Sequence, residues 1–376
     1  MASTIMKYKK NKEPYESLYK LNIGRSLDEY EAEDAMTAIL AEKDTEKRIG
    51  LMTMLLNGIM IKGPTVNEVK GLLNASLALD NIPCKQKLKI DLPENEMLIG
   101  VAASGKKGFK TINITTTACF VAAACGAYIA KASSHSTSSK TGSSDFLEIV
   151  GINPNIPIDK KIEVLRKNRI SFFSIEDTTP NFAKVYGGIF YAPHAMSFAL
   201  AGLSFPIEID ALAYGISHPN VKLSIETYKS YGFNNALVYS STEDGVHYLD
   251  ELIPSGYVNI VGMKDGKIGR QISAPIRESI EFESSSSLMS LSEKENKLEN
   301  VQESLKTLAG KGSSDQIDAI CLNAAIIMLL SRKSESLEDG YFQAKQKIKD
   351  GSAFKLLLDV VEQYGGNPDK IKKMLI

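Results

Sequence analysis

Hydrophobic and polar positions follow a helical period over the first part of the chain. Residues 47–60 carry apolar side chains at helical spacing and predict one broad apolar face. Lys62-Gly63-Pro64 ends that helix, and Thr65-Val-Asn-Glu68 has the form of a capping box that opens the next one. Ser26-Leu-Asp-Glu29 predicts another capping box upstream. We therefore expect a small all-helical domain over residues 1–86, beginning with a polar, lysine-rich lead-in.

The pattern changes near Lys87, where short apolar runs begin to alternate with helical segments. The predicted strands are 88–92, 97–103, 170–175, 211–217, 236–241 and 257–263. The predicted helices are 117–130, 159–167, 220–231 and 315–330, with two further amphipathic helices at the end. Such alternation is typical of an α/β fold with a mainly parallel central sheet flanked by helices. We expect residues 87–376 to form this α/β domain, and a later segment near 178–204 to join the helical domain.

Composition limits the classes of partner. The 376 residues are 43% hydrophobic and 24% charged, with a net charge of -1. This balance gives no bulk electrostatic reason to expect nucleic acid or an anionic membrane as partner. The longest apolar run, residues 119–130, is too short to span a bilayer. The first residues lack the apolar core of a signal peptide, and the four cysteines form no CxxC pair, so we expect a cytoplasmic protein with reduced thiols.

Residues 100–145 hold the strongest candidate chemistry. A glycine-bearing loop, Ser104 to Gly108, follows a predicted strand, and a hydroxyl-rich loop, 138–143, follows an alanine-rich helix. Glycine lets a backbone approach an anion, and lysines and helix N-termini supply positive potential. Taken singly, these segments are also compatible with a turn bearing solvated lysines, with helix capping at Asn113 and with a flexible serine-rich loop. Together they predict a phosphate-binding site.

Adjacent carboxylates at Asp250-Glu251 form a further candidate, on a loop after a predicted strand. Such pairs are common on protein surfaces. They are also typical of Mg²⁺ sites, in which one or two carboxylates hold the ion and substrate phosphates and water complete its coordination.

The order of these clusters resembles the anthranilate phosphoribosyltransferase family, which is related to the pyrimidine nucleoside phosphorylases. That family carries GTGGD-x-x-x-T-x-N-x-S-T, an alanine-rich helix, and then KHGNRSVSSKSGSAD-x-L-E. The matching residues are Gly108-Phe-Lys-Thr111-Ile-Asn113-Ile-Thr115-Thr116, FVAAACG at 120–126, Lys131, and Ser138 through Glu148. The likeness extends from NGIMIKGPTVNEV at 57–69 to Leu322-Asn323-Ala324-Ala325 and covers nearly the whole chain.

The resemblance implies a phosphoribosyltransferase that uses phosphoribosyl pyrophosphate (PRPP) and Mg²⁺, with a homodimer formed through the helical domain. It implies catalytic roles for Asn113 and Lys131, and metal ligands at Thr115, Asp250 and Glu251. The implied PRPP-binding residues are Gly105, Lys106, Lys107, Gly108, Thr111, Asn113, Thr115, Thr116, Lys131, Ser138, Ser139, Lys140, Gly142 and Ser143.

Departures from the family pattern fall on the chemistry. GTGGD reads Ala103-Ser104-Gly105-Lys106-Lys107 here, so a glycine and the acid have become lysines. No arginine lies between Arg169 and Arg270, although the family holds the anthranilate carboxylate with an arginine; Lys184 and His194 are candidates for that role. We therefore expect an enzyme that transfers phosphoribose to an acceptor other than anthranilate. The alternative is a non-catalytic relative that keeps the fold for binding or assembly.

Overall fold

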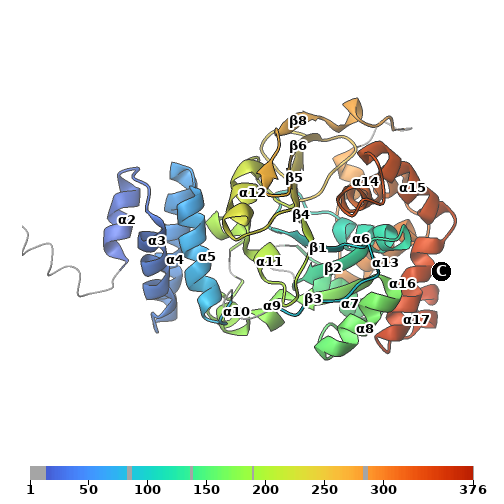
Figure 1. Cartoon of the computed structure of the whole chain (residues 1–376), viewed down its shortest axis with the longest axis horizontal. Helices are drawn as coiled ribbons and strands as arrows, with labels where there is room; N and C mark the ends of the chain where they lie inside the picture. Colours follow the sequence, from blue (N-terminus) through green and yellow to red (C-terminus); the bar gives the residue numbers. More distant parts are fainter. Residues whose placement is uncertain (1–13, 83–86, 136–138, 189, 283–286, 376) are drawn as a thin grey trace, which may run out of the picture.

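The computed structural model describes residues 14–82, 87–135, 139–188, 190–282 and 287–375 (Figure 1). The chain begins with four helices: α2 (Tyr15–Asn22), α3 (Glu29–Leu40), α4 (Thr45–Lys62) and α5 (Val66–Ala78). They form a unit to one side of the sheet, in blue at the left of Figure 1. The loose polar lead-in was predicted over residues 1–20. Residues 1–13 lie outside the described residues, and the rest of the prediction is wrong, because α2 already begins at Tyr15.

Helix boundaries in this unit confirm one predicted capping box and correct the other. The Thr65 side chain accepts from the Glu68 N–H, and Glu68 caps Thr65 in return, as predicted. The box predicted at Ser26 is wrong, because Asp28 is the N-cap of α3 and pairs with Glu31. The later start leaves Leu27 buried, with its N–H donating to the Glu68 carboxylate over 3.0 Å. Asp28 is as good a cap as serine, so the burial of Leu27 decides between them.

The central sheet has the order β3-β2-β1-β4-β5-β6-β7, with β8 pairing β6. Strands β1 to β5 are parallel to one another, and β6, β7 and β8 add antiparallel pairs at one edge. This confirms the predicted mainly parallel α/β sheet. The strands are β1 (Leu98–Ala103), β2 (Tyr128–Ser133), β3 (Ile170–Ser174), β4 (Ala211–Gly215), β5 (Ala236–Thr242), β6 (Tyr257–Lys264), β7 (Lys267–Ile268) and β8 (Ile272–Pro275).

Two predicted elements are corrected. Residues 88–92 form no strand; Leu88 makes only an isolated bridge to Ile207. The helix predicted over 117–130 is α6 (Ile114–Ala124), and the chain then turns at Gly126, with φ 101°, into strand β2. The alanine-rich composition concealed this turn, because both the helix and the following strand are buried and apolar.

Helices cover both faces of the sheet because side chains alternate along each strand. Ile99 and Val101 of β1 join a core made largely with the C-terminal helices, whereas Leu98 and Ala102 join a core shared with α2 to α5. The first face is covered by α6, α7 (Ser143–Val150), α8 (Ile158–Asn168), α13 (Lys297–Leu308), α14 (Ser314–Leu330), α15 (Leu337–Lys349), α16 (Ser352–Gln363) and α17 (Pro368–Lys373). Three helices therefore follow α14, where two were predicted.

The segment near 178–204, which was expected to join the helical domain, contains short helices on the second face of the sheet. These are α9 (Ile175–Thr178), α10 (Pro180–Tyr186), the 3₁₀ helix η1 (Ala195–Phe198) and α11 (Leu200–Leu203), followed by α12 (Val221–Ser230). The Asp80 carboxylate accepts the N–H groups of Asn181 and Phe182, both over 2.9 Å, and so ties this segment to the end of α5. The proposed domain boundaries remain a prediction, since the second core runs without a break from α2 to the sheet.

The remaining described elements are η2 (Ile276–Glu278) and η3 (Leu288–Leu291). Cys119, Cys125 and Cys321 are free thiols, and Cys84 lies outside the described residues. Among the helices that the structure describes, none has the length and apolar character needed to cross a membrane.

Candidate functional site

A cavity of about 510 Å³ opens at the carboxyl ends of the parallel strands. Its lining includes Ala103 from the end of β1 and Lys131 and Ala132 from β2. Strand β1 pairs β2 on one side and β4 on the other, so the chain order reverses at β1. In open α/β sheets this reversal leaves a crevice in which ligands bind. The fold therefore places the segments singled out in the sequence at one site.

Two helix N-termini face this cavity. Asn113 precedes α6 and Gly142 precedes α7, and both line the cavity. The Asn113 Nδ2 donates to the Gly142 carbonyl over 3.4 Å, which holds the two N-termini together. Asn113 Oδ1 and Thr141 Oγ1 are buried and have no partner among the described residues. Helix N-termini favour anions, and the Thr141 hydroxyl can donate to one. Asn113 Oδ1 can only accept a hydrogen bond, so this wall is suited to a ligand that carries both an anionic group and a hydroxyl donor.

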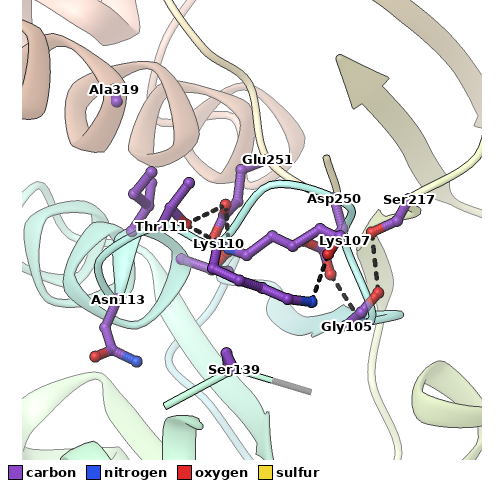
Figure 2. Close-up of polar contacts among 12 residues, drawn as sticks. Gly105, Lys107, Lys110, Thr111, Asn113, Ser139, Ser217, Asp250, Glu251 and Ala319 are labelled. Carbon is purple, nitrogen blue, oxygen red and sulfur yellow. Dashed lines mark hydrogen bonds and ion pairs between the residues drawn. The ribbon is translucent and has the colours of Figure 1, made fainter. Parts of the chain in front are cut away.

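Lys107 and Glu251, which both line the cavity, form an ion pair (Figure 2). The Lys107 Nζ lies 2.6 Å from Glu251 Oε2 and 2.5 Å from Thr111 Oγ1. The Thr111 hydroxyl donates to the same carboxylate oxygen over 3.1 Å, and the Thr115 hydroxyl donates to Glu251 Oε1 over 3.3 Å. Both oxygens of Glu251 are thus engaged by the chain itself.

Asp250 is held by the glycine-bearing loop. The Gly105 N–H donates to Asp250 Oδ2 over 2.6 Å, and the Ser217 hydroxyl donates to the Gly105 carbonyl over 2.9 Å (Figure 2). Gly215 lies directly against the Asp250 backbone: a Cβ there would approach the Asp250 carbonyl oxygen to 1.9 Å. The side chain of Asn323 bonds both the N–H and the carbonyl of Leu252, over 3.0 and 2.8 Å, and fixes the chain after the acidic pair.

The lysines of the site differ in the pKa of their ammonium groups. Burial acts to lower the pKa of Lys107, but the charges of Glu251 and Asp250 outweigh it and raise this pKa above its ordinary value. Burial lowers the pKa of Lys131, whose Nζ donates to the Ala132 carbonyl over 2.5 Å. Burial, with a smaller contribution from the charge of Lys110, lowers the pKa of Lys106 to about 8. Lys107 is therefore the permanently charged member of the loop.

Aromatic side chains also line the cavity. Phe182 and Tyr186 stack at 5.1 Å between ring centroids, and the Lys106 Nζ lies 5.6 Å from the centre of the Tyr186 ring. The Tyr186 hydroxyl bonds His194 Nε2 over 2.6 Å. Burial and the charge of Lys106 lower the pKa of His194 to about 3, so this imidazole is neutral and serves as a hydrogen-bonding group rather than a cation. The wall is suited to a planar, apolar ring.

Most of the predicted site residues line this one cavity. They are Gly105, Lys106, Lys107, Thr111, Asn113, Thr115, Thr116, Lys131, Ser139, Gly142, Ser143, Asp250 and Glu251. Gly108 lines a neighbouring cavity, and Lys140 points elsewhere, its Nζ donating to the Lys294 carbonyl over 3.1 Å. Ser138 lies outside the described residues. The individual roles assigned to these residues remain predictions.

Sequence reasoning missed part of the lining. Phe182 and Tyr186 were not singled out, and of the two candidates for the missing arginine, His194 lines the cavity whereas Lys184 is absent from its lining. The available signal was a concentration of aromatic residues over 182–194, without a regular period.

Lys106 shows how the altered loop keeps its shape. Gly105 and Lys106 both adopt left-handed backbone angles, with φ of 63° and 59°, which glycine adopts most easily. Lys106 stands where the family pattern has a glycine and retains a glycine-like conformation. The loop therefore gains a cation without losing its turn.

This arrangement predicts a pH dependence of anion binding. The protonated Lys106 attracts an anion, so the affinity for sulfate, whose charge is constant in this range, should fall as pH rises through about 8. We expect a loss of about tenfold between pH 7 and pH 9.5. The Lys106→Gly variant, which suits the left-handed turn, should bind more weakly at pH 7 and show little pH dependence. NMR titrations with sulfate would measure both; an unchanged profile in the variant would contradict the assignment.

Comparison with known proteins places these features in context. The family model described as "Glycosyl transferase family, a/b domain" matches residues 95–354. The chain is 27% identical to an anthranilate phosphoribosyltransferase of Shewanella baltica, covering 91% of this chain and 93% of the relative. It is 28% identical to that of Methanobrevibacter smithii, covering 92% and 98%.

Solved structures share the fold. The anthranilate phosphoribosyltransferase of Thermus thermophilus superimposes with a TM-score of 0.72 at 24% identity, covering 93% of this chain and 99% of that one. The enzyme of Saccharomyces cerevisiae, solved in complex with PRPP and Mg, gives a TM-score of 0.70 at 18% identity, covering 94% and 98%.

Proposed function

This chain belongs to the glycosyl transferase family that includes the anthranilate phosphoribosyltransferases, and we propose that it transfers a phosphoribosyl group from PRPP to an aromatic acceptor other than anthranilate. The observation that carries the proposal is the single cavity lined both by the anion-binding groups of the two polar loops and by the aromatic side chains of Phe182 and Tyr186. A phosphorylated sugar and a planar acceptor would meet within it.

The polar lining suits the phosphates and the ribose. The α6 and α7 N-termini supply N–H groups, the buried Thr141 hydroxyl can donate to a phosphate oxygen, and the buried Asn113 Oδ1 can accept from a ribose hydroxyl. In the reaction, an acceptor nitrogen would bond to C1 of the ribose as the C1–oxygen bond to pyrophosphate breaks, and the nitrogen would lose a proton. Negative charge then develops on the leaving pyrophosphate. Catalysis would consist mainly of positioning and of neutralising this charge with N–H donors and lysines.

The lining around Phe182 and Tyr186 supports an acceptor that differs from anthranilate. Lys106, over the Tyr186 ring, is the cation at this wall, and no arginine occurs between Arg169 and Arg270 to hold a carboxylate with two parallel bonds. A single ammonium makes a weaker and less directional contact with a carboxylate than a guanidinium does. An aromatic amine that needs no bidentate partner fits these groups better.

Mg²⁺ is the cofactor we expect to accompany PRPP, as in the yeast relative. Bound phosphates would supply ligands to such an ion beside the Thr115 hydroxyl. The acidic pair fits a metal poorly, because Glu251 is engaged by Lys107, Thr111 and Thr115, and Asp250 by Gly105. No step of the proposed reaction depends on a metal held by Asp250 and Glu251. Dimerisation through the helical domain also remains a prediction; exposed Tyr19, Tyr30 and Ile61 on α2 to α4 are compatible with it.

An assay of pyrophosphate release tests the proposal. The protein would be incubated with PRPP, Mg²⁺ and a panel of aromatic and heterocyclic amines that includes anthranilate. We expect at least one other amine to accelerate release well above the rate with anthranilate, and Lys131→Met to abolish the acceleration. If pyrophosphate were released fastest with anthranilate, the proposal that the acceptor differs from anthranilate would be refuted. PRPP binding without transfer to any amine would favour the non-catalytic alternative.

A further inference from the structure

The acidic pair at Asp250 and Glu251 is paired with a cation that belongs to the chain. Both carboxylates are almost fully buried, with 3% and 4% of their surfaces exposed. Buried carboxylates require compensation, either by a bound metal or by a positively charged side chain. Here the Lys107 Nζ supplies it, 2.6 Å from Glu251 Oε2, and the Lys107 side chain is itself only 13% exposed.

The Lys107 ammonium occupies a carboxylate oxygen that a divalent ion would need as a ligand. Mg²⁺ requires a near-octahedral shell of oxygen atoms and binds through one or two carboxylates. Glu251 Oε2 already accepts from Lys107 and Thr111, and Glu251 Oε1 accepts from Thr115. A dication on the same carboxylate would lie only a few ångströms from the ammonium, and like charges at that distance repel strongly. Within the described ranges, no group of three or more His, Cys, Asp or Glu side chains could hold a metal.

The surrounding chain holds Lys107 in this place. The preceding turn is fixed at Gly105 through its N–H to Asp250 and through Ser217, and the Lys110 Nζ donates to the Lys107 carbonyl over 2.5 Å (Figure 2). The Lys107 side chain also bonds Thr111 on the far side of the loop. Hydrogen bonds therefore hold both the backbone carbonyl and the side-chain nitrogen of Lys107 in place. The residue lines the cavity where a phosphate would approach.

We propose that the Lys107 ammonium takes the place of a protein-bound divalent cation at Asp250 and Glu251, so that the counter-charge to this acidic pair is built into the chain. The acidic pair then serves to hold Lys107 toward the cavity rather than to ligate metal. A metal ion that arrives on a phosphorylated substrate is a separate ion and needs neither carboxylate. The link to a sugar phosphate rests on the proposed function, whereas the exclusion of metal from the pair does not.

Binding of Mn²⁺ to the full-length protein, without any phosphorylated ligand, tests this directly. Free Mn²⁺ would be followed by electron paramagnetic resonance in the wild type, Glu251→Gln, Lys107→Met and the Lys107→Met/Glu251→Gln double variant. We expect wild type and Glu251→Gln to behave alike. Lys107→Met should bind one Mn²⁺ at least tenfold more tightly than the wild type, and the double variant should lose that site. Lys106→Gly, which removes the neighbouring lysine, should gain no site.

Two outcomes would overturn the proposal. One is a Mn²⁺ site in the wild type that Glu251→Gln removes. This comparison needs no substitution at Lys107, so it decides the matter even if Lys107→Met fails to fold. The other is a folded Lys107→Met variant that gains no Mn²⁺ site. Failure of the wild type to bind PRPP would count against the proposed function and leave the metal result standing.

Discussion

Replacing Lys107 with methionine should lower the free energy of unfolding by about 3–5 kcal/mol at pH 7.5, the range found when one partner of a buried ion pair is removed. The substitution leaves Asp250 and Glu251 buried without their cation. Burial already raises the pKa of Asp250, and Lys107 is the main group that opposes this rise. Without Lys107 the pKa of Asp250 should rise further.

The sign of the pH dependence follows from this change. A carboxyl group whose pKa is higher in the folded than in the unfolded state favours folding at low pH and loses that contribution as pH rises through the folded value. The stability deficit of Lys107→Met should therefore shrink between pH 7.5 and pH 5. Urea unfolding at both pH values measures it.

Lys297→Met provides a matched control. Lys297 pairs with Asp145 over 2.5 Å, but its side chain is 56% exposed, so solvent screens the pair and the same substitution should cost under about 1 kcal/mol. Equal losses of unfolding free energy in Lys107→Met and Lys297→Met would contradict the importance assigned to the buried Lys107–Glu251 pair.

Replacing Gly215 with alanine should destabilise the protein by about 3 kcal/mol and weaken PRPP binding about tenfold or more. The new Cβ would meet backbone atoms of Asp250, at 1.9 Å from the carbonyl oxygen and 2.7 Å from the carbonyl carbon. Backbone atoms cannot rotate away as a side chain does, so residues 250 and 251 must shift. Lys107 would then lose its alignment with Glu251.

Gly262→Ala is the control for this substitution. Gly262 lies in β6 of the same sheet, where the nearest atom to a new Cβ is the Ala236 carbonyl oxygen at 4.0 Å. We expect a change of under about 1 kcal/mol and unaltered PRPP affinity. Thermal unfolding and calorimetry on both variants make the comparison. A mild effect at Gly215 would show that residues 250 and 251 are not held by this close approach.

Periodicity and composition sufficed to predict β1 and β3 to β6, because these strands are short apolar runs separated by polar segments. They failed at β2, where strand and preceding helix are equally apolar and only Gly126 marks the turn. Many polar residues that line the cavity could be named in advance, since hydroxyl and glycine positions cluster within a short stretch of sequence.

The Lys107–Glu251 pair could not be predicted in the same way. Its partners are 144 residues apart. Lys107 follows β1, whereas Glu251 lies in the connection between β5 and β6, and β4 stands between β1 and β5 in the sheet. From the sequence, Lys107 was a lysine in the place of the family's acid; the structure adds that it forms an ion pair with Glu251. The aromatic wall was missed because Phe182 and Tyr186 come from a short helix without a readable period.

Calorimetric titration of PRPP into the wild-type protein in the presence of Mg²⁺ tests the central claim, that the cavity at the carboxyl ends of β1, β2 and β4 binds a phosphorylated ribose. We predict saturable binding of one PRPP per chain, with a dissociation constant below about 1 mM, as is usual for substrates. Lys131→Met should weaken it at least tenfold. Absence of saturable binding at about 1 mM, or equal binding by Lys131→Met, would contradict the account.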